Sequence, residues 1–354
     1  DPAVRAVAKS TQAFGIGLID VDPPTPEPDE VLIRVEAAGI CGSDVHIYEW
    51  TPGYDFLIPH LPVVLGHEFS GEIVEVGRGL AGPFRTGDRV TSETGRVCRR
   101  CLYCKRGQAI LCPRRTAYGR LGLERRGAMA AYVAVPEECL HRVPDGVSPE
   151  EAAMTEPAAV ALGAVELADL APGEPVVILG PGPIGLLVLA MCRAVGAGPI
   201  VVVGQEEDAR RLATARRMGA AEALGGDWDA VTRCVTALTD GFGAAVVFEA
   251  SGSPAAAAAG LTLLRKGGEM VLVGIYPEPV QVDATREVVR QMKSIRGSYG
   301  GSSLDFDRVL TLVAAKRVDL APLISEILPL TEAARGFELL RRKEAFKVLL
   351  RPES

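Results

Sequence analysis

The sequence predicts an α/β chain in two parts, a β-rich part followed by a doubly wound parallel sheet with helices on both faces. Two observations indicate this arrangement. Short strand-like runs separated by Pro- and Gly-rich turns fill roughly the first 150 residues, and from about residue 172 apolar runs alternate with helix-length segments. The length of 354 residues agrees with two domains of roughly 150 residues each.

In the β-rich part, strands are expected at 31–37 and 72–76, with Pro23-Pro24 and Gly87-Asp88 among the turns. In the second part, four apolar runs predict buried strands, at 176–179, 200–203, 246–249 and 270–273. Three helical segments accompany them, at 184–195, 208–218 and 255–264. Because parallel strands need crossover connections, this alternation predicts a parallel sheet. Beyond residue 295 the chain is expected to return through two amphipathic helices, at 305–315 and 331–341.

Composition narrows the class of protein. Apolar residues make up 48% of the chain, enough for a large core, and the charge balance is 38 − 45 = −7. A nucleic-acid binder needs a basic surface, so this class is disfavoured. We find no apolar stretch of about 18 residues and no apolar core of a signal peptide near the N-terminus, so we expect a cytoplasmic protein without a membrane partner. There the eight cysteines should be reduced, and clustered ones indicate metal.

A glycine-rich turn follows the strand predicted at 176–179. Gly180, Gly182 and Gly185 form G-x-G-x-x-G around Pro183 and Ile184, between a predicted strand and a predicted helix. The first glycine permits the tight turn, the second allows backbone to approach a pyrophosphate, and the third lets the helix pack on the strand. The turn alone could be purely structural, but its strand–turn–helix setting predicts a Rossmann-type dinucleotide site.

The end of the next strand should meet the adenosine ribose. An acidic residue there favours NAD, because it accepts a hydrogen bond from the 2′-hydroxyl. Counting forward from the preceding glycine gives Gly204, and counting back from the following one gives Glu206. Glu206 favours NAD, whereas Gly204 would leave room for a 2′-phosphate, with Arg210 or Arg211 as its partner. We expect NAD and leave NADP open.

Four cysteines in a short segment have the spacing of a metal site. Cys98, Cys101, Cys104 and Cys112 form C-x2-C-x2-C-x7-C. Four thiolates suit a closed tetrahedral zinc that leaves no position for a substrate, so the site is expected to be structural. An iron–sulfur cluster is the alternative.

Three residues earlier in the chain suit an open metal site. Cys41 supplies a thiolate, His67 an imidazole and Glu68 a carboxylate, a set that can hold zinc and leave one coordination position free. Taken alone, His67 would be typical of a core histidine. Glu156, just before the second part, could complete the ligand set or hold a zinc-bound water.

Several short motifs, taken in their order along the chain, resemble those of one protein family. Gly-Ile-Cys-Gly-Ser-Asp-Val-His at 39–46, Gly-His-Glu-x-x-Gly at 66–71, Gly-Asp-Arg-Val at 87–90, the four cysteines, Glu-Pro at 156–157 and G-x-G-x-x-G resemble the zinc-dependent medium-chain dehydrogenases, in the branch of sorbitol (polyol) and L-threonine 3-dehydrogenases. The likeness spans nearly the whole chain.

The resemblance implies roles for the candidate residues. The ligands of the catalytic zinc would be Cys41, His67, Glu68 and Glu156, and the four-cysteine segment would hold a second zinc. Ser43 and His46 would relay the proton of an alcohol to solvent. The reaction would be a reversible hydride transfer between a small alcohol and NAD(P).

The resemblance also implies the domains. A GroES-like catalytic domain would cover 1–158 and be completed by 298–354, with the Rossmann domain at 159–297. Relatives of this kind are commonly dimers or tetramers, so a homo-oligomer is expected.

The substrate stays open at this point. Threonine dehydrogenases usually carry a histidine shortly before the first cysteine of the four, which 94–97 lacks, and Gly-Ile-Thr-Gly-Arg where this chain has Gly-Ser-Tyr-Gly-Gly at 297–301. The Phe-Arg-Tyr of animal sorbitol dehydrogenases is also absent from that area. A secondary alcohol on a polyol, cyclitol or sugar-like molecule is expected first, and L-threonine or a similar amino alcohol second. A non-catalytic nucleotide binder is disfavoured, because Cys41, His67 and Glu68 are all present.

Overall fold

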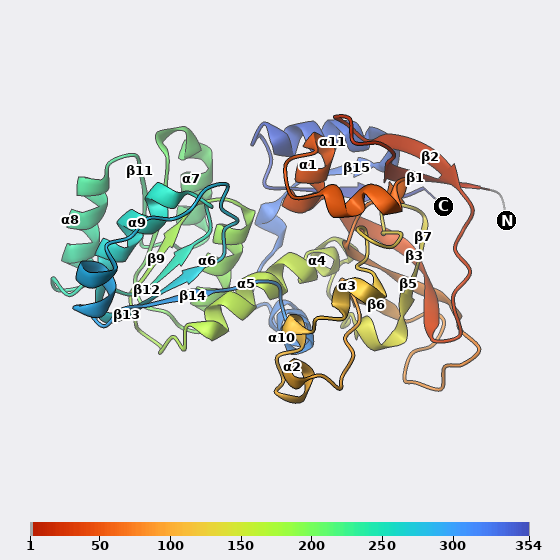
Figure 1. Cartoon of the computed structure of the whole chain (residues 1–354), viewed down its shortest axis with the longest axis horizontal. Helices are drawn as coiled ribbons and strands as arrows, with labels where there is room; N and C mark the ends of the chain where they lie inside the picture. Colours follow the sequence, from red (N-terminus) through yellow and green to blue (C-terminus); the bar gives the residue numbers. More distant parts are fainter. Residues whose placement is uncertain (1–2, 354) are drawn as a thin grey trace. The chain divides into compact units, whose positions relative to one another are not determined.

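A computed structural model describes residues 3–353, which divide into two compact units. The first unit runs to Glu156 and also contains Ser302–Lys316 and the chain from Leu320 onward, whereas the second contains Pro157–Gly301 and Arg317–Asp319. Figure 1 shows both, the second drawn mainly in green and cyan. The chain thus changes unit after 156 and 301, where the sequence places the boundaries after 158 and 297.

The first unit is built on two sheets. A three-stranded sheet has the order β2-β1-β4, and a larger one has the order β15-β16-β3-β5-β6-β8, with β7 also paired to β3. The strands are β1 (Val4–Lys9), β2 (Gly17–Val21), β3 (Glu30–Gly39), β4 (Val63–Val64), β5 (Glu68–Val76), β6 (Arg89–Ser92), β7 (Tyr132–Pro136), β8 (Leu140–Arg142), β15 (Ile324–Pro329) and β16 (Lys347–Arg351).

Short helices close the first unit. They are α1 (Gly42–Glu49), α2 (Leu102–Lys105), α3 (Arg115–Tyr118), α4 (Pro149–Ala153), α10 (Ser303–Ala314) and α11 (Ala333–Arg341), and α5 (Thr155–Leu167) leads into the second unit. The core includes Ile33, Phe69 and Ile73 from the sheet together with Phe337 from α11 and Val348 from β16. The returning C-terminal segment therefore completes this core rather than forming one of its own.

The second unit is a six-stranded parallel sheet in the order β11-β10-β9-β12-β13-β14. The strands are β9 (Val176–Leu179), β10 (Ile200–Gly204), β11 (Glu222–Gly225), β12 (Ala244–Glu249), β13 (Leu264–Leu272) and β14 (Ser294–Gly297). The helices are α6 (Pro183–Ala194), α7 (Ala209–Arg217), α8 (Trp228–Leu238) and α9 (Pro254–Leu263). This order is that of a Rossmann fold, so the predicted doubly wound sheet is confirmed.

The central strands show why this sheet forms. Every residue of β9 and of β12 is buried, as expected for parallel strands covered on both faces. None of the helices in the described part of the chain is long and apolar enough to span a membrane.

Candidate active site and metal centres

Cys41 lies where β3 has ended and α1 begins. It is the N-cap residue of α1, and its backbone N–H donates to Asp44 Oδ2 at 3.0 Å. Asp44 is fully buried, and burial raises the pKa of its carboxyl group. The first turn of α1 therefore fixes the backbone that carries the Cys41 thiol.

His67 and Glu68 lie at the start of β5, after a sharp bend at Gly66. Gly66 has φ +96°, and a Cβ there would come within 2.7 Å of the Met129 side chain, so this position requires glycine. Gly39 of β3 pairs with Glu68, and a Cβ on it would lie 2.3 Å from Glu68 Oε2. The two glycines make room for the bend and for the carboxylate.

The structure brings three of the predicted ligands together. One donor atom each from Cys41, His67 and Glu68 lies within 4.8 Å of the other two. A thiolate, an imidazole and a carboxylate are the ligand types that zinc takes in proteins, so three such donors gathered in one place fit a zinc ion. Buried His67 Nδ1 has no hydrogen-bond partner in the described part of the chain and lies 4.0 Å from Asp44 Oδ1.

Negatively charged side chains are concentrated around His67. Burial opposes protonation of His67, but the charges of Cys41 and Asp44 outweigh it and hold the pKa of His67 well above its usual value. A site with such an excess of negative charge suits a divalent cation.

Glu156 lies at the start of α5 and outside the group of three. It is half-buried and still interacts with His67 and Glu68. Burial raises the pKa of its carboxyl group to about 7, with the charge of His67 lowering it and that of Glu68 raising it. Glu156 can therefore take up or release a proton near neutral pH beside the cluster.

Ser43 and His46 lie on α1, one turn apart. Ser43 is half-buried and His46 is exposed, with His46 Nδ1 3.3 Å from Thr51 Oγ1 and its ring stacked near Tyr54. Residues three apart on a helix share a face, so half-buried Ser43 and exposed His46 lie on the same face of α1.

The structure also brings together Cys98, Cys101, Cys104 and Cys112. Their sulfur atoms lie within 4.8 Å of one another. Backbone N–H groups point at them, with Cys101 N 3.3 Å from Cys98 Sγ and Cys98 N 3.4 Å from Cys112 Sγ. The backbone N–H of Arg100 leads the effects that lower the pKa of Cys98 to about 6, while burial and neighbouring thiols raise that of Cys104 to about 12. Four sulfur donors in one cluster, with backbone N–H groups directed at them, fit a closed zinc site.

The glycine-rich turn has the geometry that its sequence predicts. Gly180 has φ +100°, and a Cβ on Gly185 would lie 1.9 Å from the Gly180 carbonyl oxygen. Gly182 is the N-cap of α6 and has open space around it. Pro183 and Ile184 form the first turn of α6, whose free backbone donors suit a pyrophosphate.

The end of β10 carries the residues expected near the ribose. A Cβ on Gly204 would lie 2.8 Å from the Pro181 ring, so this position is closed to side chains. Glu206 is exposed in a short 3₁₀ turn (Glu206–Asp208). Arg211 is half-buried, burial lowers its pKa, and its Nη1 lies 3.9 Å from Asp208 Oδ1. Asp208, which the sequence reasoning did not single out, is a further acidic group at this strand end.

Comparison with known proteins identifies the family. Residues 27–145 match the alcohol dehydrogenase GroES-like domain, and residues 183–315 match the zinc-binding dehydrogenase domain. The chain is 38% identical to a sorbitol dehydrogenase of Halalkalibacterium halodurans over 351 residues, 99% of each chain. The chain belongs to the zinc-dependent medium-chain dehydrogenases.

Two further likenesses support this assignment. An L-threonine 3-dehydrogenase of Bacillus subtilis is 36% identical over 350 residues, 99% of each chain. The crystal structure of 2R,3R-butanediol dehydrogenase from Bacillus subtilis superimposes with a TM-score of 0.89 at 32% identity, covering 99% of this chain and 100% of that one. The predictions of a GroES-like domain with a Rossmann domain, and of an NAD(P)-dependent zinc alcohol dehydrogenase, are confirmed.

Sequence reasoning missed Lys347 in this dehydrogenase. Its Nζ donates to Glu68 Oε1 at 2.8 Å, to Glu68 Oε2 at 2.6 Å and to the Ile40 carbonyl at 3.1 Å. Burial opposes the charge of Lys347, but Glu68 and Cys41 raise its pKa, so it stays protonated. The available signal was a lysine directly before the apolar run at 348–350, near the end of the sequence.

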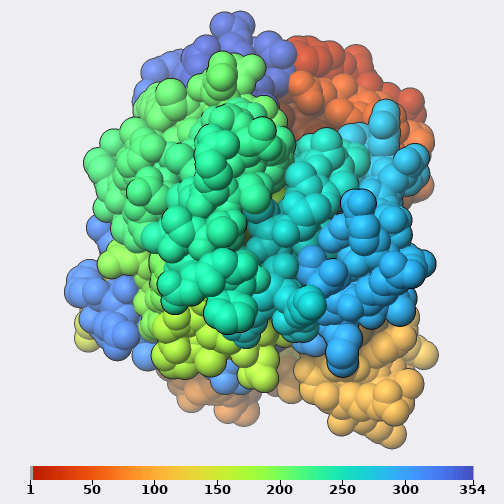
Figure 2. Space-filling view, turned by 90° about the vertical axis from the view of Figure 1, so that its left-hand side faces the viewer, coloured from red at the N-terminus to blue at the C-terminus, as the bar shows by residue number. Residues whose placement is uncertain are grey.

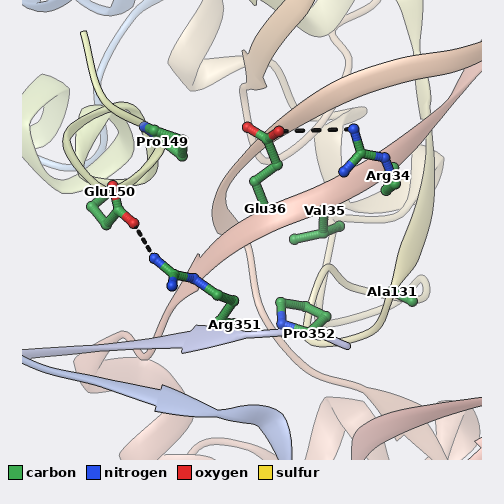
Figure 3. A pocket seen from close by; sticks show the side chains of 8 residues that line it. All are labelled: Arg34, Val35, Glu36, Ala131, Pro149, Glu150, Arg351 and Pro352. Carbon is green, nitrogen blue, oxygen red and sulfur yellow. Dashed lines mark hydrogen bonds and ion pairs between the residues drawn. The ribbon is translucent and has the colours of Figure 1, made fainter. Parts of the chain in front are cut away.

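A hollow of about 310 Å³ lies elsewhere on the first unit. Figure 3 shows its lining, which consists of Arg34, Val35, Glu36, Ala131, Pro149, Glu150, Arg351 and Pro352. Its two arginines are paired with carboxylates, Arg351 with Glu150 and Arg34 with Glu72. The lining includes none of the candidate site residues.

Proposed function

We propose that this dehydrogenase oxidises a secondary alcohol on a polyol, cyclitol or sugar-like molecule, reversibly, at Cys41, His67 and Glu68. The observation that carries the proposal is the gathering of these three donor atoms within 4.8 Å. The 38% identity to a sorbitol dehydrogenase over 99% of the chain supports the substrate class.

Each residue has a role that its position supports. Cys41, His67 and Glu68 would hold zinc, with Glu156 as a further ligand or as the holder of a water. When bound, zinc supplies Lewis-acid chemistry that favours loss of a proton from an alcohol. Half-buried Ser43 would accept that proton while giving up its own hydroxyl proton, and exposed His46 would release a proton to solvent at the end of the relay. The first turn of α6 would hold the pyrophosphate of the nucleotide that accepts hydride.

Cys98, Cys101, Cys104 and Cys112 would hold a second, structural zinc, giving two zinc ions per chain. Their sulfurs form a closed group in a short irregular segment, and the described residues provide no fifth ligand among them. We place the protein in the cytoplasm, where these cysteines and the remaining free ones would stay reduced.

NAD is the proposed nucleotide, with Glu206 near the adenosine ribose. Two acidic groups, Glu206 and Asp208, follow β10, and Asp208 lies close to Arg211, a cation that could otherwise face a 2′-phosphate. Titration with NADH and with NADPH tests this choice, and tighter binding of NADPH would reverse it.

A homo-oligomer is proposed, built on a dimer in which β14 pairs with β14 of a second copy. All residues of β14 are exposed, and within the described residues no strand pairs with its outer side. Large exposed apolar side chains lie on β14 or in the segments near it in sequence, namely Ile275, Val289, Met292, Ile295 and Tyr299. Figure 2 shows the segment around these residues in light blue on the surface turned toward the viewer. Antiparallel pairing across a two-fold axis would give the backbone groups of this strand edge hydrogen-bond partners. It would also bury the neighbouring apolar side chains.

The substrate proposal is tested by following the absorbance of reduced nicotinamide with NAD and NADP. The panel comprises polyols, cyclitols, simple secondary alcohols and L-threonine. Turnover of a polyol or cyclitol that chelation abolishes is the expected result. Turnover of L-threonine alone would overturn the substrate class and favour the second candidate, which the 36% identity to an L-threonine 3-dehydrogenase supports.

A further inference from the structure

Glu249, the last residue of β12, is a fully buried carboxylate with four hydrogen-bond donors around it. Oε1 accepts from the backbone N–H of Ser251 at 2.9 Å and from the Ser251 hydroxyl. Oε2 accepts from the backbone N–H of Gly252 at 3.1 Å and from the Tyr276 hydroxyl. None of these four donors is a cation, so local dipoles alone offset the cost of burying the charge.

The position of Glu249 in the sheet is distinctive. Strand order reverses between β9 and β12, and ligands of doubly wound sheets bind outside the carboxyl ends of the strands at such a reversal (Figure 1). Glu249 pairs with Leu179, the last residue of β9, which directly precedes the glycine-rich turn. The buried carboxylate therefore lies at the edge where the nucleotide is expected.

The 250–252 loop, which Glu249 holds, lies between two other loops at this edge. A Cβ on Gly180 would lie 2.8 Å from the Ser251 nitrogen, so the 250–252 loop lies against the glycine-rich turn. On the other side, a Cβ on Gly252 would lie 2.4 Å from the Ile275 carbonyl oxygen. The Glu249 carbonyl also accepts from the N–H groups that follow β13, at 2.8 and 2.9 Å. The 250–252 loop is thus packed between two other backbones, and the Glu249 side chain holds it from beneath.

Tyr276 contributes from the β13 side. Burial and then the neighbouring carboxylate raise the pKa of Tyr276, so its hydroxyl remains a donor. This contact links the loop after β13 to the loop after β12, and both loops belong to the second half of the sheet.

We propose that Glu249 is a positioning residue for the nicotinamide half of the nucleotide, acting through the 250–252 loop. In a Rossmann sheet, the first three strands form one mononucleotide-binding half and the next three form the other. Glu249 organises strand ends of the second half, whereas adenosine is expected at β10 in the first. The inference rests on the proposed nucleotide site and deepens it.

The test is calorimetric titration of the full-length, metal-loaded protein with NADH and, separately, with AMP. Glu249→Gln places an amide N–H₂ opposite a backbone or hydroxyl donor, and we expect it to weaken NADH binding about tenfold and to leave AMP binding within about twofold. Tyr276→Phe removes one donor and should weaken NADH binding in the same direction by less. Glu269→Gln on β13 is the matched control, since Glu269 pairs with Val246, three residues before the end of β12.

The outcomes separate the two proposals. Unchanged NADH affinity in Glu249→Gln, or equal losses for NADH and AMP, would overturn the positioning role, because a merely structural residue would affect both ligands alike. If Glu249→Gln does not fold, Tyr276→Phe decides by the same comparison of NADH with AMP. A wild-type protein that binds AMP but neither NADH nor NADPH would overturn the proposed nucleotide itself.

Discussion

Glu68 and Lys347 are 279 positions apart in the sequence and form a buried ion pair beside Cys41. A buried pair of this kind contributes little net stability when intact, because desolvation offsets the attraction, but leaving one charge without its partner is costly. The sequence marks Glu68 through its neighbour His67, whereas only the fold brings Lys347 to it. Lys347, which lies outside the Gly-His-Glu-x-x-Gly motif, therefore neutralises the charge of the candidate ligand Glu68.

Lys347→Met should destabilise the protein by about 3–5 kcal/mol when the open site is free of metal, because the charge of Glu68 is then buried without a cation. Urea unfolding measures this change. The double variant Lys347→Met, Glu68→Gln should recover most of the loss. A double variant as unstable as the single one would mean that packing of the lysine stem, and not the ion pair, is responsible.

Cys41→Ser should lower turnover by about a thousandfold or more, since several kcal/mol of Lewis-acid stabilisation depend on the metal. Elemental analysis should show the loss of one zinc per chain, with the zinc at Cys98, Cys101, Cys104 and Cys112 retained. Circular dichroism provides the control for folding. Full activity with only the four-cysteine zinc present would contradict the catalytic assignment of Cys41.

At the scale of elements, the local pattern of apolar residues predicted those strands and helices whose buried positions are apolar. The run at 176–179 is β9 without change, and the helix expected at 184–195 is observed as Pro183–Ala194. The helix expected from 305 begins at Ser303, because Ser302 and Asp305 form a capping box. The strand expected at 270–273 begins earlier, as β13 at Leu264, and α1 is among the elements that were not predicted, both for physical reasons. The first half of β13 contains Arg265, Lys266 and two glycines, and α1 lacks an apolar face of its own.

One contact of α10 makes a prediction about pH. His141 of β8 is buried, with Nδ1 2.7 Å from Asp307 Oδ1 of α10, Nε2 3.5 Å from Glu93 Oε1, and its ring stacked on Phe306. Burial opposes the charge of His141, but Glu93 and Asp307 outweigh it and raise its pKa. The sequence assigned no role to this histidine, and the structure indicates that it anchors α10.

Because the pKa of His141 is raised in the folded state, its contribution to stability is complete below the unfolded value of about 6.5 and is lost as pH rises through the folded value. Wild-type protein should therefore lose stability relative to His141→Gln as the pH rises above about 6.5. Denaturant unfolding of both proteins across this range measures the difference. Parallel curves would exclude a charged His141, and Asp307→Asn should reduce the slope in part.

At the scale of the whole molecule, β14 is an edge strand of the parallel sheet, and no strand among residues 3–353 pairs with its outer side. Met292 is 83% exposed and Ile275 75%, values unusual for large apolar side chains on a free surface. Pairing with a second copy would cover them and would extend the sheet across the two-fold axis.

Ile295→Lys should shift the oligomer toward smaller species, because a lysine on an edge strand opposes pairing with another strand. Analytical ultracentrifugation at several protein concentrations measures the shift. Leu304→Lys, at a comparably exposed position on α10, is the control and should leave the assembly unchanged. A wild-type protein that sediments as a monomer at all concentrations would contradict the proposed dimer.

The sequence by itself determined the fold class and the family and marked the candidate metal ligands, because these depend on short-range patterns. Apolar runs specify β9 and β12, glycines specify the turn at 180–185, and cysteine spacing specifies the four-thiolate cluster. Only the tertiary structure decided that Lys347 neutralises Glu68, that Glu249 joins the loops after β12 and β13, and that His141 faces Asp307. Each of these contacts joins segments that are distant in sequence or lie in separate loops, and each depends on burial, which raises the cost of an unpaired charge and thus selects its partner.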